Sequence, residues 1–132
     1  MKKNPFFKFL NLQVGHTDCR GRFFRAIGIP HKFVLVRNSM KIYELLNESG
    51  RIKINVDNFH DWVKGRRIEF KEKFLMRKTD FENVIKKLKE LHGKRYTLFF
   101  NNCYFFVNEI KKLAVDNILM QKNKERFYFK KI

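Results

Sequence analysis

The sequence predicts an α+β fold: one domain, residues 1–132, in which helices pack on an antiparallel sheet. Strand-like patterns lie mainly before residue 71 and helix-like patterns after it, a segregation typical of α+β rather than alternating α/β proteins. A chain of 132 residues is long enough to bury one hydrophobic core. Aromatic residues make up 16% of the chain, and this content, with its β-branched residues, argues against a disordered protein.

The expected strands fall at residues 9–14, 22–27, 33–36, 40–46, 51–54 and 66–70. The run at 33–36 is apolar and rich in β-branched residues, and the polar turn 37–39 after it predicts a hairpin with 40–46. The last two segments alternate charged and apolar residues, as half-exposed strands do. The tail at 126–131 alternates aromatic and basic residues, which indicates an edge strand or an ordered arm.

Helices are expected at residues 57–64, 79–92 and 102–117. Thr79 and Glu82 have the spacing of a capping box at the start of the second helix, and Gly93 is placed for a left-handed cap at its end. Gly65 is expected to close the first helix, and the asparagines at 101 and 102 are competent caps for the third. The second helix has one apolar stripe at the helical period, which consists of Phe81, Val84, Ile85, Leu88 and Leu91.

The chain carries 30 Lys+Arg against 13 Asp+Glu, a formal charge of +17, so an anionic partner is expected. A phospholipid membrane surface is the leading partner, because each Lys or Arg near it contributes about 1 kcal/mol. Nucleic acid is the alternative, since the basic aromatic tail at 121–132 also suits stacking on single strands. A basic surface that is simply solvated is the plainest interpretation. The chain lacks the ~18–20 apolar residues of a membrane span and a signal-peptide cleavage site, so we expect a cytoplasmic protein, at most peripheral at a membrane.

Cys103 and His31 are the candidate catalytic residues. Cys103 lies in the first turn of the last expected helix, where unpaired N–H groups and the helix dipole lower a thiol's pKa and can stabilise an oxyanion. A thiolate nucleophile needs an imidazole partner, and His31 begins an apolar strand that would hold its ring rigidly. A free cysteine on an apolar helix face is, however, often only a packing residue. His16 and Cys19 have metal-like spacing but lack a second ligand pair, so we expect no metal and no cofactor.

Two segments resemble motifs of the lecithin:retinol acyltransferase-like proteins. Residues 31–45, His-Lys-Phe-Val-Leu-Val followed by a turn and Lys-Ile-Tyr-Glu-Leu, look like the His-box hairpin of that family. Residues 96–107, Tyr-Thr-Leu-Phe-Phe-Asn-Asn-Cys-Tyr-Phe-Phe-Val, resemble its Asn-Cys box. The elements between the two boxes follow in the family's order, so the similarity covers a core at about 12–115.

The resemblance implies a circularly permuted papain-like fold of the NlpC-like superfamily, in which His precedes Cys. It also implies a thiol-dependent acyltransferase or hydrolase, with phospholipid the leading substrate class. Cys103 would take the acyl group as a thioester, and His31 would act as general base and then as general acid. Relatives in the superfamily cleave amide bonds, so an amidase or isopeptidase is a further option. The non-enzymatic alternative is an inactive relative that binds membrane or nucleic acid through its charge.

The residue that orients His31 depends on the register of the hairpin. Lipid-acting relatives have a second histidine downstream, at the position of Tyr43 in this chain. A register that pairs Val36 with Met40 puts Tyr43 on the His31 face, whereas a shift of one residue puts Glu44 there instead. A carboxylate is the stronger acceptor, but family spacing favours Tyr43 as the orienting residue.

Overall fold

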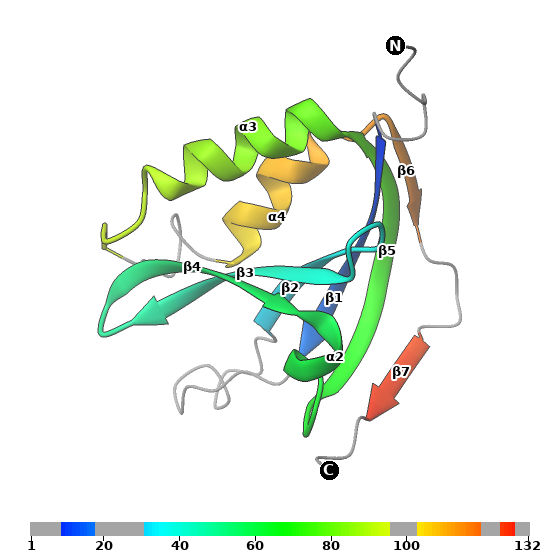
Figure 1. Ribbon diagram of the computed structural model, residues 1–132, viewed down its shortest axis with the longest axis horizontal. Coiled ribbons are helices and arrows are strands. Elements are labelled where there is room, and N and C mark those ends of the chain that lie inside the picture. Colours follow the sequence, from blue (N-terminus) through cyan, green and yellow to red (C-terminus); the bar gives the residue numbers. More distant parts are fainter. Residues whose placement is uncertain (1–8, 18–30, 96–102, 120–124, 129–132) are drawn as a thin grey trace.

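The computed structural model describes residues 9–17, 31–95, 103–119 and 125–128, without the side chains of 103–105, 116–119 and 125–128. These residues form an α+β fold on an antiparallel sheet, as the sequence predicts (Figure 1). The strands are β1 (Phe9–Thr17), β2 (His31–Val36), β3 (Lys41–Glu48), β4 (Arg51–Asn58), β5 (Arg67–Arg77), β6 (Asp116–Leu119) and β7 (Glu125–Tyr128). The helices are α2 (Phe59–Trp62), α3 (Lys78–Lys89) and α4 (Cys103–Lys111).

The sheet has the strand order β4-β3-β2-β1-β5-β6, and every pairing in it is antiparallel. β6 pairs with the second half of β5, and β7 pairs with the first half of the same strand. The two short strands therefore share the outer edge of β5. The expectation of an edge strand in the tail is confirmed for the residues of β7.

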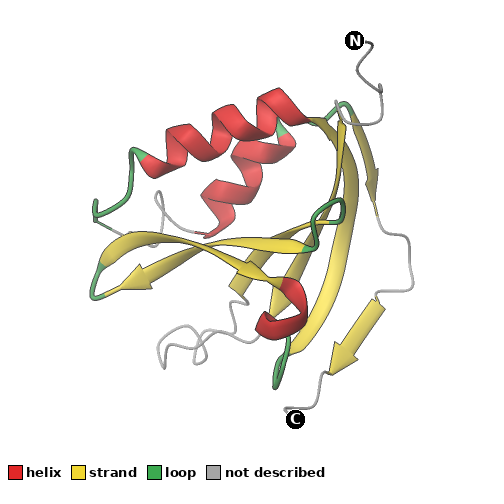
Figure 2. Ribbon diagram, in the orientation of Figure 1, coloured by secondary structure: helices red, strands yellow, loops and turns green. Residues whose placement is uncertain are grey.

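The sheet buries both of its faces. Helices α3 and α4 pack together over one face, which we call the helical face (Figure 2). The short helix α2 covers part of the other face with its buried Trp62, and we call this the tryptophan face. Side chains of a strand point alternately to the two faces, so β2 sends Val34 and Val36 to the helical face and Phe33 and Leu35 to the tryptophan face. Burial on both faces explains the continuous apolar run of β2.

Gly15 allows the Phe33 ring to pack closely against β1 on the tryptophan face. A Cβ atom at this position would lie 2.5 Å from Cζ of the Phe33 ring, which crosses over β1. The same ring contacts Trp62 at a centroid distance of 4.6 Å and Phe70 at 5.9 Å. A glycine is therefore required at this point for the aromatic cluster to close over the sheet.

The predicted elements are mostly confirmed, with corrections at their ends. β5 continues to Arg77, beyond the expected end at residue 70, because β1 pairs along almost its whole length. The capping box is wrong: α3 begins one residue earlier, after Arg77, and no side chain caps it. The third helix ends at Lys111, and residues 116–119 pair with β5 instead of continuing it. The strand expected at 22–27 lies outside the described residues.

Candidate functional site

His31 and Glu44 form a hydrogen-bonded pair on the tryptophan face. The pair joins His31 Nε2, at the start of β2, to Glu44 Oε1 in the middle of β3, at 2.8 Å. An ionised carboxylate can only accept, so Nε2 carries the proton and donates it. The other oxygen of Glu44 accepts from Asn55 Nδ2 at 3.0 Å and from Trp62 Nε1 at 2.6 Å. Four elements, β2, β3, β4 and α2, thus converge on one carboxylate.

The Glu44 side chain is almost fully buried, with 2% of the residue exposed. Burial alone would raise the pKa of this carboxyl, because it disfavours the charged form. The hydrogen bonds from His31, Asn55 and Trp62, together with the charge of His31, outweigh burial and lower the pKa below its ordinary value. Glu44 is therefore a carboxylate at neutral pH, and it accepts the proton that His31 Nε2 donates.

The hairpin register decides that Glu44, and not Tyr43, lies beside His31. Val34 pairs with Tyr43 and Val36 with Lys41, so the register that pairs Val36 with Met40 is wrong. The turn extends over 37–40 and ends with Met40 in the left-handed region, at φ 53°. This register, shifted by one residue from the expected one, turns Glu44 to the tryptophan face.

Tyr43 lies on the helical face, where it does not orient His31. Its ring packs edge-on against Phe81 of α3 at a centroid distance of 5.0 Å. Burial and the nearby Glu82 raise the pKa of the phenol, so it stays neutral. Of the two residues that the sequence left open, Glu44 is thus the one that is hydrogen-bonded to His31.

Cys103 is the first residue of α4, the position that the sequence predicts for it. Its side chain and residues 96–102, which include the expected caps at 101 and 102, lie outside the described part of the chain. α4 packs on the helical face through Phe106, Val107 and Ile110, and a hydrogen bond of 2.8 Å from Lys111 Nζ to Glu72 Oε1 anchors its far end on β5. His31 points to the tryptophan face, so the described residues do not bring its ring to the side of the sheet that carries α4.

Sequence reasoning missed Trp62 and Asn55 as members of the site. The chain has a single tryptophan, and a buried indole N–H needs an acceptor, which is the signal that could have linked Trp62 to a buried carboxylate. Asn55 pairs directly with Glu44 across β3 and β4. No local pattern in the sequence reveals that pairing, because it depends on the register of a second hairpin.

His16 lies in β1, on the helical face, and is not part of the His31 site. It pairs with Lys32 on one side and with Glu69 on the other. Burial, followed by the charges of Lys32 and Lys71, lowers the pKa of His16 to about 4. The ring is therefore neutral at physiological pH, and Cys19, its supposed metal-binding companion, lies outside the described residues.

Three further observations concern the chemistry of the site. Among the described residues, no group of three or more His, Cys, Asp or Glu side chains is arranged to hold a metal ion. The helices of that same part of the chain are too short or too polar to cross a membrane. Comparison of the chain with protein-family models, with curated proteins and with solved structures finds no match. The geometry of His31 and Glu44 is thus the ground on which a function can be proposed.

Proposed function

We propose that the protein is a thiol-dependent acyltransferase or hydrolase with a circularly permuted papain-like fold. Cys103 is the nucleophile, His31 the general base and then acid, and Glu44 the residue that orients His31. The observation that carries this proposal is the His31–Glu44 hydrogen bond, which Trp62 and Asn55 support from the other side of the carboxylate. A nucleophile, a base and a group that orients the base are the three parts of thiol catalysis.

The chemistry follows from the tautomer that Glu44 imposes. With Nε2 donating to Glu44, Nδ1 is the nitrogen that takes the proton of the Cys103 thiol. The thiolate attacks the ester carbonyl of a phospholipid, and the imidazolium returns the proton to the alcohol that leaves, so that a thioester remains on Cys103. Water, an amine or an alcohol then attacks the thioester while His31 accepts its proton, the C–S bond breaks, and His31 returns the proton to the Cys103 thiolate that leaves. The buried carboxylate stabilises the imidazolium in both steps, and the N–H groups at the start of α4 can stabilise the oxyanion.

Catalysis by this pair requires Cys103 and His31 to come close together. Cys103 and His31 are each the first residue of their element, and each follows a segment outside the described residues. The Cys103 sulfur must approach His31 Nδ1 to about 3–4 Å, at least when substrate is bound. Such an approach has to pass around the end of β2, because α4 and the His31 ring belong to opposite faces of the sheet.

Mass spectrometry of the intact chain after incubation with phosphatidylcholine of defined acyl chains tests the proposal. The expected result is an acyl adduct on Cys103 that is lost in Cys103→Ala and falls at least 100-fold in rate in His31→Gln. In Glu44→Gln, an amide N–H facing Nε2 would favour the wrong tautomer, and the rate should fall comparably. Tyr43→Phe is the matched control and should keep the rate. Failure of Cys103 to become acylated, while small thiol reagents modify it, would overturn the proposal.

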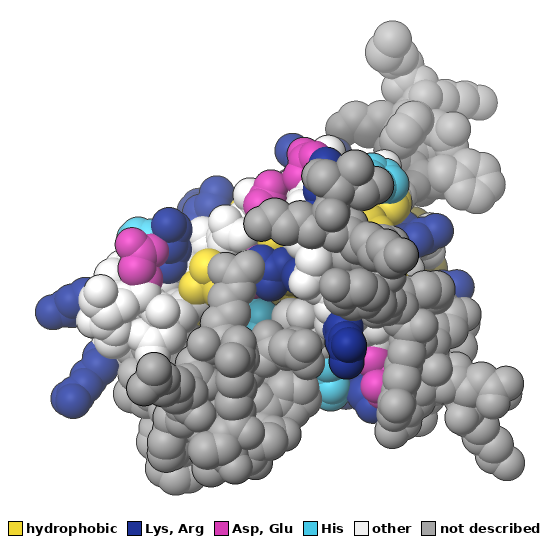
Figure 3. Space-filling model, turned by 90° about the horizontal axis from the view of Figure 1, so that it is seen from below, with side chains coloured by type: hydrophobic (Ala, Val, Ile, Leu, Met, Phe, Trp, Pro, Cys, Tyr) yellow, Lys and Arg dark blue, Asp and Glu magenta, His cyan; other side chains and the backbone are white. Residues whose placement is uncertain are grey.

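A non-catalytic, basic binding module is the second candidate, and the placement of His31 and α4 on opposite faces favours it. On the described part of the face in Figure 3, Lys and Arg side chains are scattered and do not gather at one site. Such a module should bind anionic vesicles or single-stranded DNA with a steep dependence on salt. Its binding would be unchanged in Cys103→Ala. An acylation activity that requires both Cys103 and His31 would exclude it as a full account.

A further inference from the structure

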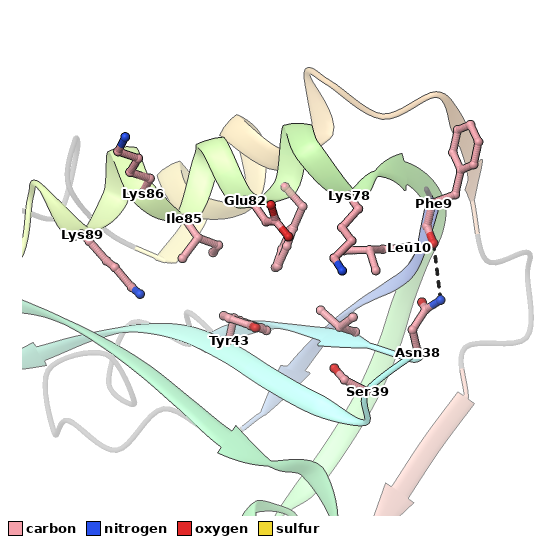
Figure 4. A pocket seen from close by; sticks show the side chains of 12 residues that line it. Phe9, Leu10, Asn38, Ser39, Tyr43, Lys78, Glu82, Ile85, Lys86 and Lys89 are labelled. Carbon is pink, nitrogen blue, oxygen red and sulfur yellow. Dashed lines mark hydrogen bonds between the residues drawn. The ribbon is translucent and has the colours of Figure 1, made fainter. Parts of the chain in front are cut away.

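A groove lies on the helical face, between α3 and the end of the sheet where β1 and the β2–β3 hairpin meet (Figure 4). Its volume is about 650 Å³, which falls within the ~300–1,000 Å³ of small-molecule sites. Apolar side chains form most of its wall, including Leu10, Val36, Phe81 and Ile85. The groove is separate from the His31 site, because these side chains and that site lie on opposite faces of the sheet.

The rim of the groove is cationic. Three lysines of α3 line it, Lys78, Lys86 and Lys89, with Glu82 as the acidic residue among the lining groups. In the part of the chain that the structure covers, none of these lysines forms an ion pair. Figure 4 shows Lys78 and Lys89 reaching from α3 toward the hairpin, while Lys86 points away from it. An apolar wall below unpaired ammonium groups is complementary to an anion with a hydrocarbon chain.

Charge decides between the occupants that an apolar groove could have. The chain's own first eight residues, MKKNPFFK, contain two phenylalanines but three lysines and no acid, so their charge is not complementary to the rim. A second copy of a chain with a net charge of +17 is disfavoured in the same way. A docked protein buries about 800 Å² on each partner, which exceeds what a pocket of this size offers. A small anionic amphiphile fits the size of the groove and is complementary to both its apolar wall and its cationic rim.

We propose that this groove binds a long-chain fatty acid. The carboxylate lies at the Lys78 ammonium, beside Ser39 of the hairpin turn, and the alkyl chain runs along α3 over Phe81 and Ile85. Lys78 and Lys89 are about 16 Å apart along the helix at 1.5 Å per residue, so a single carboxylate contacts only one of them. This site goes beyond the proposed enzymatic function and does not depend on it.

Isothermal titration of the full chain with saturated fatty acids, below their micelle concentrations, tests the assignment. Each added CH₂ that enters the groove should tighten binding about four-fold, until the groove is filled. Dodecyltrimethylammonium, which has the same length of chain as dodecanoate but the opposite charge, should not bind. Binding that is absent for every chain length, or equal for the anion and the cation, would overturn the proposal.

Exposed residues of α3 supply variants with opposite expected signs. Lys78→Gln should weaken dodecanoate binding about five-fold, because it removes the charge at the carboxylate. Glu82→Gln should tighten binding, because it removes the acidic group of the rim. Lys87→Gln is the matched control, since Lys87 lies on the same helix but outside the groove. Equal affinities in Lys78→Gln and Lys87→Gln would refute the placement of the carboxylate, whereas Cys103→Ala should bind as the wild type does.

Discussion

Replacement of Glu44 by glutamine tests the buried network directly. The substitution keeps the size of the side chain but removes the charge that holds His31, Asn55 and Trp62. Hydrogen bonds to charged groups contribute about 1.5–3 kcal/mol each and neutral ones about 0.5–1.5 kcal/mol, and the glutamine amide can keep some of the three. Glu44 is 2% exposed, so solvent does not screen the loss. We expect the free energy of unfolding to fall by about 1–3 kcal/mol at pH 7.

The pH dependence gives this prediction its sign. The pKa of Glu44 is lowered from an ordinary value of 4.5, so the carboxylate contributes stability above that pH and loses it as pH falls through the folded-state pKa. The carboxylate's contribution to the difference between wild type and Glu44→Gln should therefore be full at pH 7 and shrink below pH 4.5. Urea denaturation followed by fluorescence of Trp62, the single tryptophan of the chain, measures it.

Glu48→Gln is the matched control for this experiment. Glu48 lies on the same strand and pairs with Lys53 at 3.0 Å, but its side chain is 64% exposed. Exposed ion pairs contribute about 0–1 kcal/mol, so this variant should lose less than 1 kcal/mol. Equal losses in the two variants, with the same pH dependence, would refute the reasoning that Glu44 is a buried carboxylate that accepts three hydrogen bonds.

Further predictions concern three other positions of the fold, Gly15, His16 and Tyr43. Gly15→Ala should cost about 1–3 kcal/mol of unfolding free energy, because its Cβ would lie 2.5 Å from Phe33, and adding Phe33→Leu should recover part of the loss. An NMR titration of His16 should give a midpoint of about 4, and a midpoint at the ordinary 6.5 would contradict its buried, cationic surroundings. Because the unfolded chain takes up this proton first, the His16→Gln variant should lose less stability between pH 6.5 and 4 than the wild type does. Tyr43→Phe should change stability by less than about 0.5 kcal/mol in a thermal melt, since the ring contact with Phe81 remains.

Signals that act within one segment predicted much of the fold. The apolar stripe of α3 and the apolar run of β2 each mark their element without reference to distant residues. Gly65 and Gly93, expected to end helical segments, both have a positive φ, at 77° and 84°, but α2 and α3 end a few residues earlier, with Val63 and Glu90 as their C-cap residues. The helix–strand segregation that predicts α+β is therefore present in the local sequence.

Features that depend on pairing between strands far apart in the sequence could not be predicted from local patterns. The second half of β5 is a strand because β1 and β6 pair with it from both sides, and residues 116–119 leave the helical pattern for the same reason. The expected hairpin register was wrong by one residue, because the turn ends at Met40, a residue other than glycine that lies in the left-handed region. No turn signal in the sequence marks that position.

The one-residue shift of the hairpin register also bears on why this sheet buries a carboxylate. It turns Glu44 inward, to the tryptophan face, and Tyr43 to the wall of the groove on the helical face. Burying an ion pair costs several kcal/mol per ion before its bonds repay it, and apolar residues of similar size often give equal or greater stability. Stability alone therefore does not account for a histidine held by a carboxylate that three donors fix. The general-base role that we propose for His31 would account for it, because a proton fixed on Nε2 leaves Nδ1 to accept the proton of a thiol.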